Sequence, residues 1–419
     1  MENYFTHGRM LQIASDFIFF YPLVMMHVWL VGALFFYFKW ERKQVTVPEL
    51  AVTPPISILL PCHNEGENVR EAIDSLLQQT YPAFEIIAIN DGSTDNTGPL
   101  LNEISRLHPQ VRVVHLAVNQ GKAMALRAGA LMSSNEFLVC IDGDALLDAQ
   151  ACIWMMSHLA APHVGAVTGN PRIRNRSTLL GKIQVGEFSS IVGIIKRAQR
   201  IYGRLFSVSG VVVAFRKRAL WEVGFWSPDM VTEDVDITWK LQRAGWEIRF
   251  EPNAKCWILM PETVSGLWQQ RLRWAQGGSE VLLRNFGVFG NWKQRHMWLV
   301  FLELGLSLLW VYTAAIVLLA TVVMLSTGYA NALLPAHFVS SNNIFFILVL
   351  SSLVQFAVGI FLDSRYESHL WKTYIWIIWY PFLYWIMIAC ATFFGFPKAL
   401  LKKRGQRALW NSPDRGFKP

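Results

Sequence analysis

The sequence predicts an α/β domain with a mostly parallel, doubly wound sheet, joined to a membrane-spanning helical part. Two observations predict this combination. Short apolar runs rich in β-branched residues alternate with helix-like stretches between residues 56 and 141, which is typical of parallel strands joined by helices. Uncharged runs of about 20 residues, long enough to cross the core of a bilayer, lie before and after that region.

The elements of the predicted sheet follow one another in a regular order. Strands are expected at residues 56–60, 85–90, 111–116 and 137–141. Helices are expected between them, at residues 66–78, 95–107 and 121–132. In such a sheet a ligand binds beyond the carboxyl ends of the strands, so the residues that follow each strand matter most for function.

Apolar runs also predict how the chain meets the membrane. They lie at residues 17–38, 304–325, 344–362 and 373–396. Basic residues are scarce before the first run but follow it at Lys39, Arg42 and Lys43, so the domain inserted after it should face the cytoplasm. The fourth run is unusually aromatic and carries Pro381 at its middle. We expect it to be re-entrant, broken or interfacial, which leaves the basic tail on the cytoplasmic side.

These patterns divide the chain into successive parts. We expect an N-terminal transmembrane segment (1–40), a cytoplasmic α/β domain (41–262), interfacial helices (263–297), a C-terminal transmembrane region (298–396) and a basic tail (397–419).

Composition narrows the classes of function. The chain is 53% hydrophobic, too apolar for a purely soluble protein, and its formal net charge is +8. The basic residues are spread along the chain without a nucleic-acid motif, which favours anionic lipid and a phosphate-bearing ligand over nucleic acid. The five cysteines lack the paired spacing of a zinc or redox site, and we expect them to be small buried residues in a reducing compartment.

Polar side chains follow all four predicted strands. The Asn64-Glu65 pair follows the first strand, Asp91 the second, Lys122 the third and Asp142 the fourth. A carboxylate after a strand can simply cap the next helix, as we expect of Asp95. Four polar strand ends together favour one shared site over four separate caps.

The pair Asp142 and Asp144 is a candidate metal site. The chain has neither a GxGxxG nor a GxxxxGK[ST] motif, so it lacks the phosphate cradle of dinucleotide-binding and P-loop proteins. A diphosphate can instead be held by a divalent cation on carboxylates. Two positions apart in a segment expected to be extended, these carboxylates can point the same way and share the cation. The alternative is that Asp-Gly-Asp forms only a turn.

Asp234 is a candidate general base. Thr232 is expected to be the N-cap of a helix that ends near Gly245, so Asp234 lies in the first turn of that helix. An aspartate needs no large pKa shift to be ionised and to accept a proton from a hydroxyl. The alternative is that the acid only complements the helix dipole.

A helix expected over residues 263 to 285 carries the last candidate residues. It sets Gln270, Arg273 and Trp274 on one face, while the opposite face suits a membrane interface. One face can therefore touch a ligand at the mouth of the membrane part. The alternative is that the Arg and Trp side chains only anchor the helix among lipid headgroups.

Six strings in order along the chain, PCHNE, NDGSTD, NQGKA, DGD, TED and QRLRW, resemble the motifs of a processive family 2 glycosyltransferase with a GT-A domain. Each string is common alone, but all six in this order and spacing are highly specific. A QxxRW motif beside membrane spans is typical of polymerases such as cellulose, chitin and hyaluronan synthases. Longer stretches, among them VCIDGDALLD, FEPNAKCWILMPET and WNSPDRG, resemble bacterial synthases of poly-β-1,6-N-acetyl-D-glucosamine, a biofilm exopolysaccharide.

The resemblance implies donor-site roles for the residues at the strand ends. Asp91 would contact the uracil, the Asn64-Glu65 loop would line the nucleoside, and Lys122 would lie near the base or the diphosphate. Asp142 would contact the ribose or the diphosphate. Asp144, with Asp142, would hold a divalent cation, Mg²⁺ or Mn²⁺.

The resemblance also implies the reaction. Asp234 would be the base for the acceptor hydroxyl, and Gln270, Arg273 and Trp274 would hold the pyrophosphate and the acceptor sugar, Trp274 by stacking on its face. UDP-N-acetylglucosamine would be polymerised with inversion into β-1,6-linked poly-N-acetylglucosamine. The growing poly-N-acetylglucosamine chain would be exported across the inner membrane of a bacterium by this multi-pass protein.

Two alternatives share the same motifs. A chitin- or hyaluronan-type synthase would join sugars at another hydroxyl, and an inactive membrane scaffold or transporter would keep only the fold. The intact Asp144, Asp234 and Gln270 argue against the inactive protein.

Regulation is a further implication of the resemblance. It implies the lipid bilayer, a small membrane subunit and cyclic di-GMP as partners. Arg172, Arg174, Arg176 and the basic residues of the tail are the candidates for a cyclic di-GMP site. The alternative for them is contact with lipid headgroups, or a solvated face.

Overall fold

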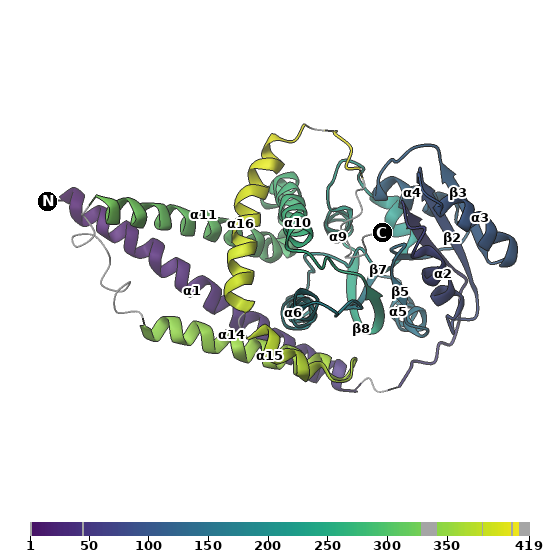
Figure 1. Ribbon diagram of the computed structural model, residues 1–419, viewed down its shortest axis with the longest axis horizontal. Helices are drawn as coiled ribbons and strands as arrows, with labels where there is room; N and C mark the ends of the chain where they lie inside the picture. The colour runs from purple at the N-terminus through teal and green to yellow at the C-terminus, as the bar shows by residue number, and fades with distance from the viewer. Residues whose placement is uncertain (1, 44–45, 328–341, 379, 404, 410–419) are drawn as a thin grey trace.

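The computed structural model describes residues 2–43, 46–327, 342–378, 380–403 and 405–409. An α/β domain lies at one end of the molecule, and long helices extend from it toward the other end (Figure 1). The run WNSPDRG, which begins at residue 410, lies outside the described residues.

Among the described residues, eight strands form one sheet in the order β3-β2-β1-β4-β7-β6-β8-β5. Their bounds are β1 Ile56–Cys62, β2 Phe84–Asp91, β3 Val111–Leu116, β4 Phe137–Ile141, β5 Leu146–Leu147, β6 Val164–Ile173, β7 Val212–Arg216 and β8 Glu247–Ile258. β1 is parallel to β2 and β4, and β2 is parallel to β3, which confirms the four expected strands. β7 runs antiparallel between β4 and β6, so the second half of the sheet is mixed.

Helices cover both faces of the sheet. Successive residues of a strand point to opposite faces, so a strand that is apolar throughout presents apolar side chains to helices on both sides. Ile58 and Leu60 of β1 face one apolar layer, and Leu59 faces the other; all three are fully buried. The first layer is completed by α2 Val69–Leu77, α3 Thr97–Leu107 and α5 Ala151–Leu159. The second is completed by α4 Lys122–Met132, α8 Lys217–Glu222 and α9 Glu233–Arg243. Each large apolar side chain buried in this way contributes about 1.5–3 kcal/mol.

Further helices connect the sheet to the membrane part. After β6, three helical segments follow one another without a break: α6 Leu179–Glu187, the π-helix η2 Phe188–Gly193 and α7 Ile194–Tyr202. α10 Val264–Arg284 follows β8 and confirms the helix expected over residues 263 to 285. Thr263 caps it, because its side chain accepts a hydrogen bond from the amide of Gly266 at 3.1 Å. The short helices η3 Phe286–Gly290 and η4 Trp292–Met297 come next.

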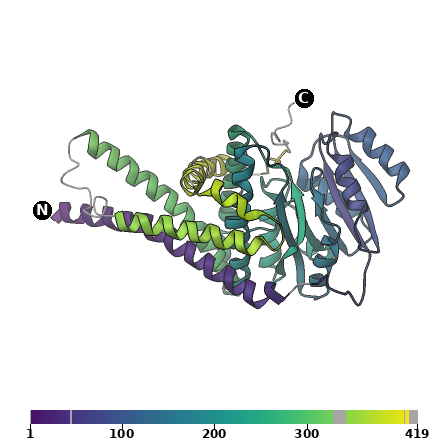
Figure 2. The same cartoon turned by 60° about the horizontal axis from the view of Figure 1, so that its bottom comes forward.

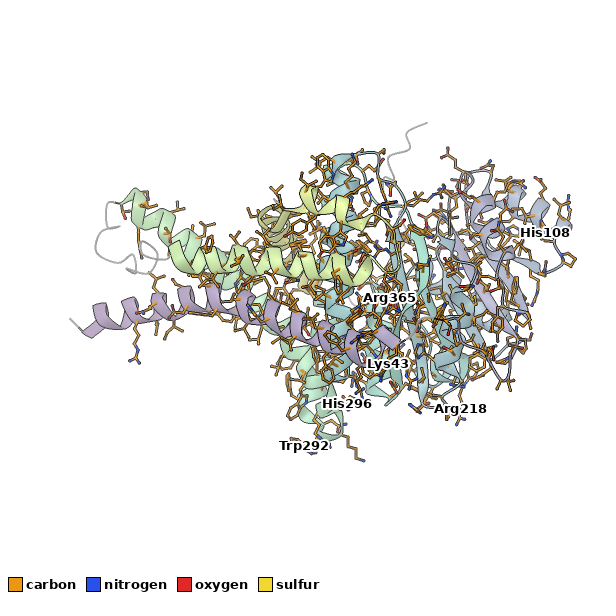
Figure 3. All side chains as sticks on the ribbon, turned by 90° about the horizontal axis from the view of Figure 1, so that it is seen from below. Lys43, His108, Arg218, Trp292, His296 and Arg365 are labelled. Carbon is orange, nitrogen blue, oxygen red and sulfur yellow. The ribbon has the colours of Figure 1, made fainter. Side chains whose placement is uncertain are left out.

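Within the described part of the chain, three helical segments are long and apolar enough to cross a membrane. They correspond to α1 Glu2–Lys39, α11 Trp298–Ser326 and α14 Asn342–Asp363, and they extend from the same edge of the α/β domain (Figures 1 and 2). α1 approaches α7 closely, since a Cβ on Gly32 would lie 2.7 Å from the Cβ of Ala198. Lys43, after α1, and Arg365, after α14, lie at the junction with the α/β domain (Figure 3).

The fourth apolar run does not form one spanning helix. It is divided into η5 Leu370–Thr373, α15 Tyr374–Ile377 and α16 Tyr380–Leu401, which confirms the expected break. Pro381 lies inside α16, near its start, rather than between two helices. α16 crosses the direction of α1, α11 and α14 and packs on α10 (Figure 1), where a Cβ on Gly395 would lie 2.9 Å from the amide nitrogen of Gln276.

The arginines proposed for a cyclic di-GMP or headgroup surface are engaged in ion pairs within the chain. Arg172 is 2% exposed, and its guanidinium lies 2.5 Å from Asp363 and 2.6 Å from Glu367. Arg176 also pairs with Glu367, and Arg174 pairs with Glu71 of α2 at 2.7 Å. Arg172 therefore neither contacts lipid headgroups nor lies on a solvated face. Its charge is buried and is compensated by Asp363, the last residue of α14, and by Glu367, which follows α14.

Candidate active site

The ends of β1, β2 and β3 are held together by side chains that the sequence singled out. Asp91, fully buried at the end of β2, accepts hydrogen bonds from the amides of Gln120 and Gly121, both at 2.8 Å. The carbonyl oxygen of Asp91 lies 2.8 Å from the Nδ1 atom of His63, after β1. Asp91 therefore fixes the loop that leads from β3 into α4.

The loop after β1 has an unusual backbone. Asn64 has a φ of 55°, a left-handed conformation that asparagine tolerates better than most residues. Its side-chain oxygen accepts a hydrogen bond from the Thr94 amide at 2.9 Å, and its own amide donates to Ser93 at 3.0 Å. Glu65, which is 1% exposed, donates its amide to Thr97 at 2.8 Å. The loops after β1 and β2 thus form one unit.

Asp95 closes this unit at the start of α3. Asn96 occupies the N-cap position without a side-chain capping bond. Instead, Asp95 accepts hydrogen bonds from the amides of Thr97 and Gly66, both at 3.0 Å. The expected helix-capping role is confirmed, one residue before the formal N-cap. Burial would raise the pKa of Asp95, but these hydrogen bonds lower it below its usual value.

Lys122, the first residue of α4, connects the loops after β1 and β2 to α9 through the turn after β4. Its ammonium pairs with Asp142, lies 3.3 Å from Glu233 and donates to the carbonyl of Gly210 at 3.0 Å. Burial alone would lower the pKa of Lys122, but the carboxylates of Asp142 and Glu233 raise it above its usual value. Lys122 is therefore a fixed positive charge inside the site.

Asp142 and Asp144 lie in a turn, not in an extended segment. The amide of Ala145 donates to the carbonyl of Asp142 at 3.1 Å, and this bond closes the turn. The prediction of an extended segment was wrong. Asp142-Gly143-Asp144 directly follows the buried strand β4, so from the sequence the turn could not be told apart from a continuation of that strand. Gly143 between them is crowded, since a Cβ there would lie 3.1 Å from the carbonyl oxygen of Pro61 and 3.3 Å from the Cys62 sulfur.

Carboxylates gather at this end of β1. Burial first, and then Glu65, Asp144 and Asp142, raise the pKa of the Cys62 thiol well above its usual value. No cluster of three or more His, Cys, Asp or Glu side chains fit to hold a metal ion occurs among the described residues. The two aspartates still fit Mg²⁺ or Mn²⁺, because such ions bind one or two carboxylates and complete their coordination with phosphate oxygens and water.

Asp234 faces the same region from the first turn of α9. Its carboxylate accepts hydrogen bonds from the amides of Val235 at 2.9 Å and Gly210 at 3.2 Å. Burial, and then the Glu233 carboxylate, raise the pKa of Asp234 to about 6, against the opposing charges of Lys122 and Arg273. The side chain thus becomes a proton acceptor of moderate strength near neutral pH.

The expected ends of α9 are both confirmed. Thr232 occupies the N-cap position, although its side chain makes no capping hydrogen bond. Its hydroxyl instead faces α10, where a Cβ on Gly277 would lie 2.1 Å from it. α9 ends at Arg243, and Gly245, with a φ of 95°, follows as expected.

α10 brings the QxxRW residues beside α9 and α16. Gln270 is 8% exposed, and its side-chain oxygen has no hydrogen-bond partner within the described residues. Arg273 is exposed and contributes to the field at Asp234, while Trp274 is 36% exposed. A buried, unpartnered amide oxygen beside an exposed arginine and an exposed indole is suited to a ligand that brings its own hydrogen-bond donors.

The family "Glycosyltransferase like family 2" matches residues 54–277, from β1 to the middle of α10. The match contains every residue of the site described above. The chain belongs to this glycosyltransferase family.

The glycosyltransferase is similar to proteins of known name over nearly its whole length. It is 42% identical over 409 residues to the poly-beta-1,6-N-acetyl-D-glucosamine synthase of Staphylococcus epidermidis, covering 96% of this chain and 98% of the relative. The synthase of the same name from Staphylococcus aureus strain COL has the same identity and coverage. Similarity therefore extends through the sheet, α10 and the long helices.

The fold of the glycosyltransferase occurs among solved structures. A mannosyltransferase from Pyrobaculum calidifontis, in complex with GDP-Man and Mn²⁺, superposes with a TM-score of 0.55 at 21% identity, over 81% of this chain and 99% of the other. This likeness shows the GT-A fold that the sequence predicted, and at this level of identity it shows the fold alone.

Some residues of the glycosyltransferase site were not found from the sequence. Glu233 pairs with Lys122 and raises the pKa of Asp234, and the TED string that contains it gave no reason to prefer it over its neighbours. Gly210 offers its carbonyl to Lys122 and its amide to Asp234. No local pattern marks such a backbone role, which depends on β7 lying between β4 and β6.

The chain after α16 also reaches the glycosyltransferase site. Lys402 lies 3.0 Å from Glu280 of α10, and the amide of Ala408 donates to the carbonyl of Pro228 at 2.9 Å. The carbonyl of Ala408 would lie 2.2 Å from a Cβ on Gly121, in the loop that Asp91 fixes. The part of the tail that the structure describes thus lies against the α/β domain, on the side where the sequence placed the tail.

Proposed function

We propose that this glycosyltransferase polymerises N-acetylglucosamine from UDP-N-acetylglucosamine into β-1,6-linked poly-N-acetylglucosamine. The observation that carries the proposal is the 42% identity over 96% of the chain to synthases named for this polymer. The sequence identity continues through the α/β domain, α10 and the long helices, and this favours a shared reaction as well as a shared fold. The carboxylates, the lysine and the exposed tryptophan of the site support the proposal, because they can bind a diphosphate, accept a proton and stack on a sugar.

The chemistry is one displacement with inversion. Asp234 accepts the proton of the acceptor hydroxyl while the hydroxyl oxygen attacks C1 of the donor sugar. The bond from C1 to the diphosphate breaks, and UDP leaves with the electron pair. No covalent enzyme intermediate is required. A pKa of about 6 keeps Asp234 ionised at neutral pH while leaving it basic enough to hold the proton.

Other side chains bind and orient the donor. The Asn64-Glu65 loop and the loop before α4, which the buried Asp91 holds in place, receive the uridine. The positive charges of Lys122 and Arg273 attract the diphosphate. Asp142 and Asp144 would hold Mg²⁺ or Mn²⁺, and this ion, when bound, would offset the charge that develops on UDP.

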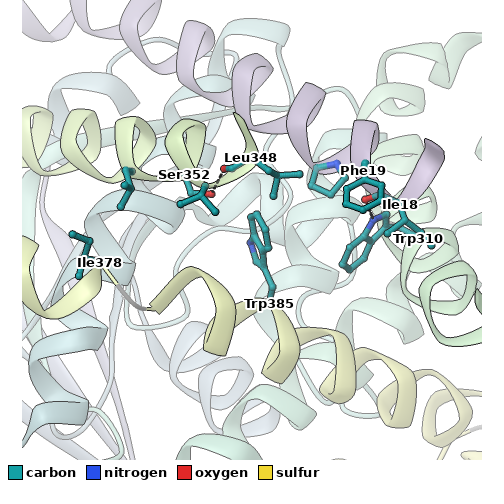
Figure 4. A pocket seen from close by; sticks show the side chains of 10 residues that line it. Ile18, Phe19, Trp310, Leu348, Ser352, Ile378 and Trp385 are labelled. Atoms are coloured by element: carbon teal, nitrogen blue, oxygen red, sulfur yellow. Dashed lines mark hydrogen bonds between the residues drawn. The ribbon is translucent and has the colours of Figure 1, made fainter. Parts of the chain in front are cut away.

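The acceptor and the product use the membrane side of the molecule. Gln270 and Trp274 receive the acceptor sugar, the indole by stacking on its apolar face. Two adjoining cavities of about 180 and 220 Å³ lie between α1, α11, α14 and α16, and both are lined by Trp310, Ser352 and Trp385; Figure 4 shows the smaller one. The two indole rings, in a lining that is otherwise mainly aliphatic, offer flat faces on which a sugar chain can stack on its way across the membrane.

The location and partners complete the proposal. The protein resides in the bacterial inner membrane, with its catalytic domain in the cytoplasm, because basic residues follow α1 and lie in the tail. A small membrane subunit and cyclic di-GMP stimulate the polymerisation. Arg172 is excluded from the nucleotide contact by its buried ion pairs, which leaves the more exposed basic side chains as candidates.

Turnover of the purified chain in lipid nanodiscs tests the proposal. UDP release and polymer formation from UDP-N-acetylglucosamine should require Mg²⁺ or Mn²⁺, and Asp144→Asn should abolish both. Asp148→Asn is the matched control, because Asp148 lies just after β5 and pairs with Lys255 at 3.1 Å outside the site. Adding the small subunit and cyclic di-GMP should increase turnover. Polymer formation that is independent of a divalent cation would refute the donor site as described.

A further inference from the structure

Arg271, within the QxxRW run but outside its defining residues, is the most deeply buried charged residue of α10. Its side chain is 1% exposed, and its guanidinium lies 2.8 Å from each carboxylate oxygen of Glu187, which is equally buried. The same guanidinium lies 4.3 Å from the centroid of the Trp274 ring. Arg271 and Trp274 are three residues apart on one helix, so their side chains lie on the same face.

The burial of this ion pair is not explained by stability alone. Removing two charges from water costs several kcal/mol, and only complete hydrogen bonding recovers that cost. The Nε atom of Arg271 has no hydrogen-bond partner within the described residues, so the guanidinium is not fully satisfied. A planar guanidinium stacked on an indole does, however, restrict how the ring can turn. Trp274 is 36% exposed, and without such a contact its ring would have more rotamers available.

Glu187 connects the pair to the membrane part. It is the last residue of α6, and the π-helix Phe188–Gly193 begins at the next residue. Ile191 of that π-helix lines the larger cavity between the long helices. π-helical turns are rare and occur frequently at functional sites. Arg271 thus contacts the exposed indole of Trp274 directly. Through its ion pair with Glu187 it is also connected to the π-helix that borders the larger cavity.

We propose that Arg271 is a positioning residue for polymer elongation. Held by Glu187, it fixes the Trp274 ring in the orientation that stacks on the terminal sugar of the growing glycan, so that the glycan stays aligned with the cavity instead of dissociating. This inference rests on the proposed function, in which Trp274 binds the acceptor sugar. It adds a determinant of chain length that does not itself touch donor, acceptor or metal.

The test compares polymer length and donor kinetics in the full chain in nanodiscs. Arg271→Lys keeps the charge and the partner Glu187 but loses the planar stack, because lysine presents a compact ammonium. Mean polymer length should fall about tenfold, which corresponds to ~1.4 kcal/mol of weaker retention of the glycan. The KM for UDP-N-acetylglucosamine should stay within about twofold, because the donor does not contact the pair. Glu187→Gln should shorten the polymer in the same way.

Two comparisons separate positioning from a structural role. Arg197→Lys is the matched control, since Arg197 is fully buried and pairs with Glu41 at 2.7 Å but does not contact Trp274. It should destabilise the protein without shortening the polymer. In a Trp274→Ala background, Arg271→Lys should have no further effect on polymer length, because the ring through which it acts is absent.

Each result decides the matter. Polymer of ordinary length from Arg271→Lys, together with short polymer from Trp274→Ala, would overturn the positioning role and leave the proposed function intact. Ordinary polymer from Trp274→Ala would overturn the acceptor role of the tryptophan, and the positioning role with it. Additive shortening in the double variant, or equal shortening by Arg197→Lys, would show that Arg271 acts through stability and not through the ring.

Discussion

The ionisation of Asp234 should control how turnover depends on pH. Burial and the neighbouring Glu233 carboxylate raise the pKa of Asp234 from its usual 3.8 to about 6. A general base works only when ionised, so turnover should be lost as the pH falls through about 6. An unperturbed aspartate would keep turnover nearly constant down to about pH 5.

The size of the effect follows from the pKa. With a pKa of about 6, the ionised fraction of Asp234 in the free protein is about 97% at pH 7.5 and about 9% at pH 5, so kcat/KM should fall about tenfold. With a pKa near 3.8, about 94% would remain ionised at pH 5, and turnover would hardly change.

Glu233→Gln provides the perturbation. It removes the like charge that helps to raise the pKa of Asp234, so the acidic limb of the profile should move to lower pH. Lys122→Gln removes an opposing charge, so it should move the limb to higher pH. Glu103→Gln is the control, because Glu103 is exposed and pairs only with Arg70 at the surface.

The assay is UDP release in nanodiscs, with kcat/KM for UDP-N-acetylglucosamine measured between about pH 4.5 and 8.5 and reversibility checked by return to neutral pH, because kcat/KM reports the ionisation of the free protein. The variants are compared by the pH at which the acidic limb lies and not by its height, because weaker donor binding in Lys122→Gln lowers kcat/KM at every pH. A wild-type limb near pH 4, or shifts of the same sign in Glu233→Gln and Lys122→Gln, would refute Asp234 as a buried base poised between these charges.

The remaining predictions concern single substitutions. Asp234→Asn should reduce UDP release by about 10²–10⁴-fold, the usual contribution of a general base, while binding of UDP survives in a titration; undiminished turnover would exclude Asp234 as the base. Trp274→Ala should shorten or eliminate polymer more than it weakens the affinity for UDP, and weaker UDP binding with unchanged polymer length would show the tryptophan to be misassigned. Gly277→Ala introduces a Cβ 2.1 Å from the Thr232 hydroxyl, so it should destabilise the protein by about 1–3 kcal/mol in thermal unfolding. Gly290→Ala, which meets nothing within 4 Å, is its control, and equal unfolding midpoints would contradict the close packing of α9 on α10.

The parallel half of the sheet could be predicted because its signals are local. Each strand from β1 to β4 is a short, mainly apolar segment, and polar residues end or follow it. The Asn64-Glu65 loop, Asp91 and Lys122 were therefore found before their contacts were known. α10 was predicted for the same reason, since a helical period is visible within one segment.

The rest depends on contacts between distant segments. Arg172 resembled a surface arginine until α14 brought Asp363 and Glu367 to it from nearly 200 positions away. Thr232 is the N-cap that the sequence predicted, but nothing local predicts that its hydroxyl lies against Gly277 of α10 instead of capping the helix. The approach of Ala408 to Gly121 has no local signal at all. Long-range packing of this kind overrides the propensity of a single residue, which is all that a local pattern reports.

The linkage of the product tests the central proposal most directly. The purified chain should be incubated with UDP-N-acetylglucosamine and a divalent cation, and the polymer analysed by methylation and mass spectrometry. The account predicts N-acetylglucosamine joined through the 6-hydroxyl in the β configuration. A 1,4-linked product would contradict it and would identify a chitin-type synthase built on the same catalytic residues.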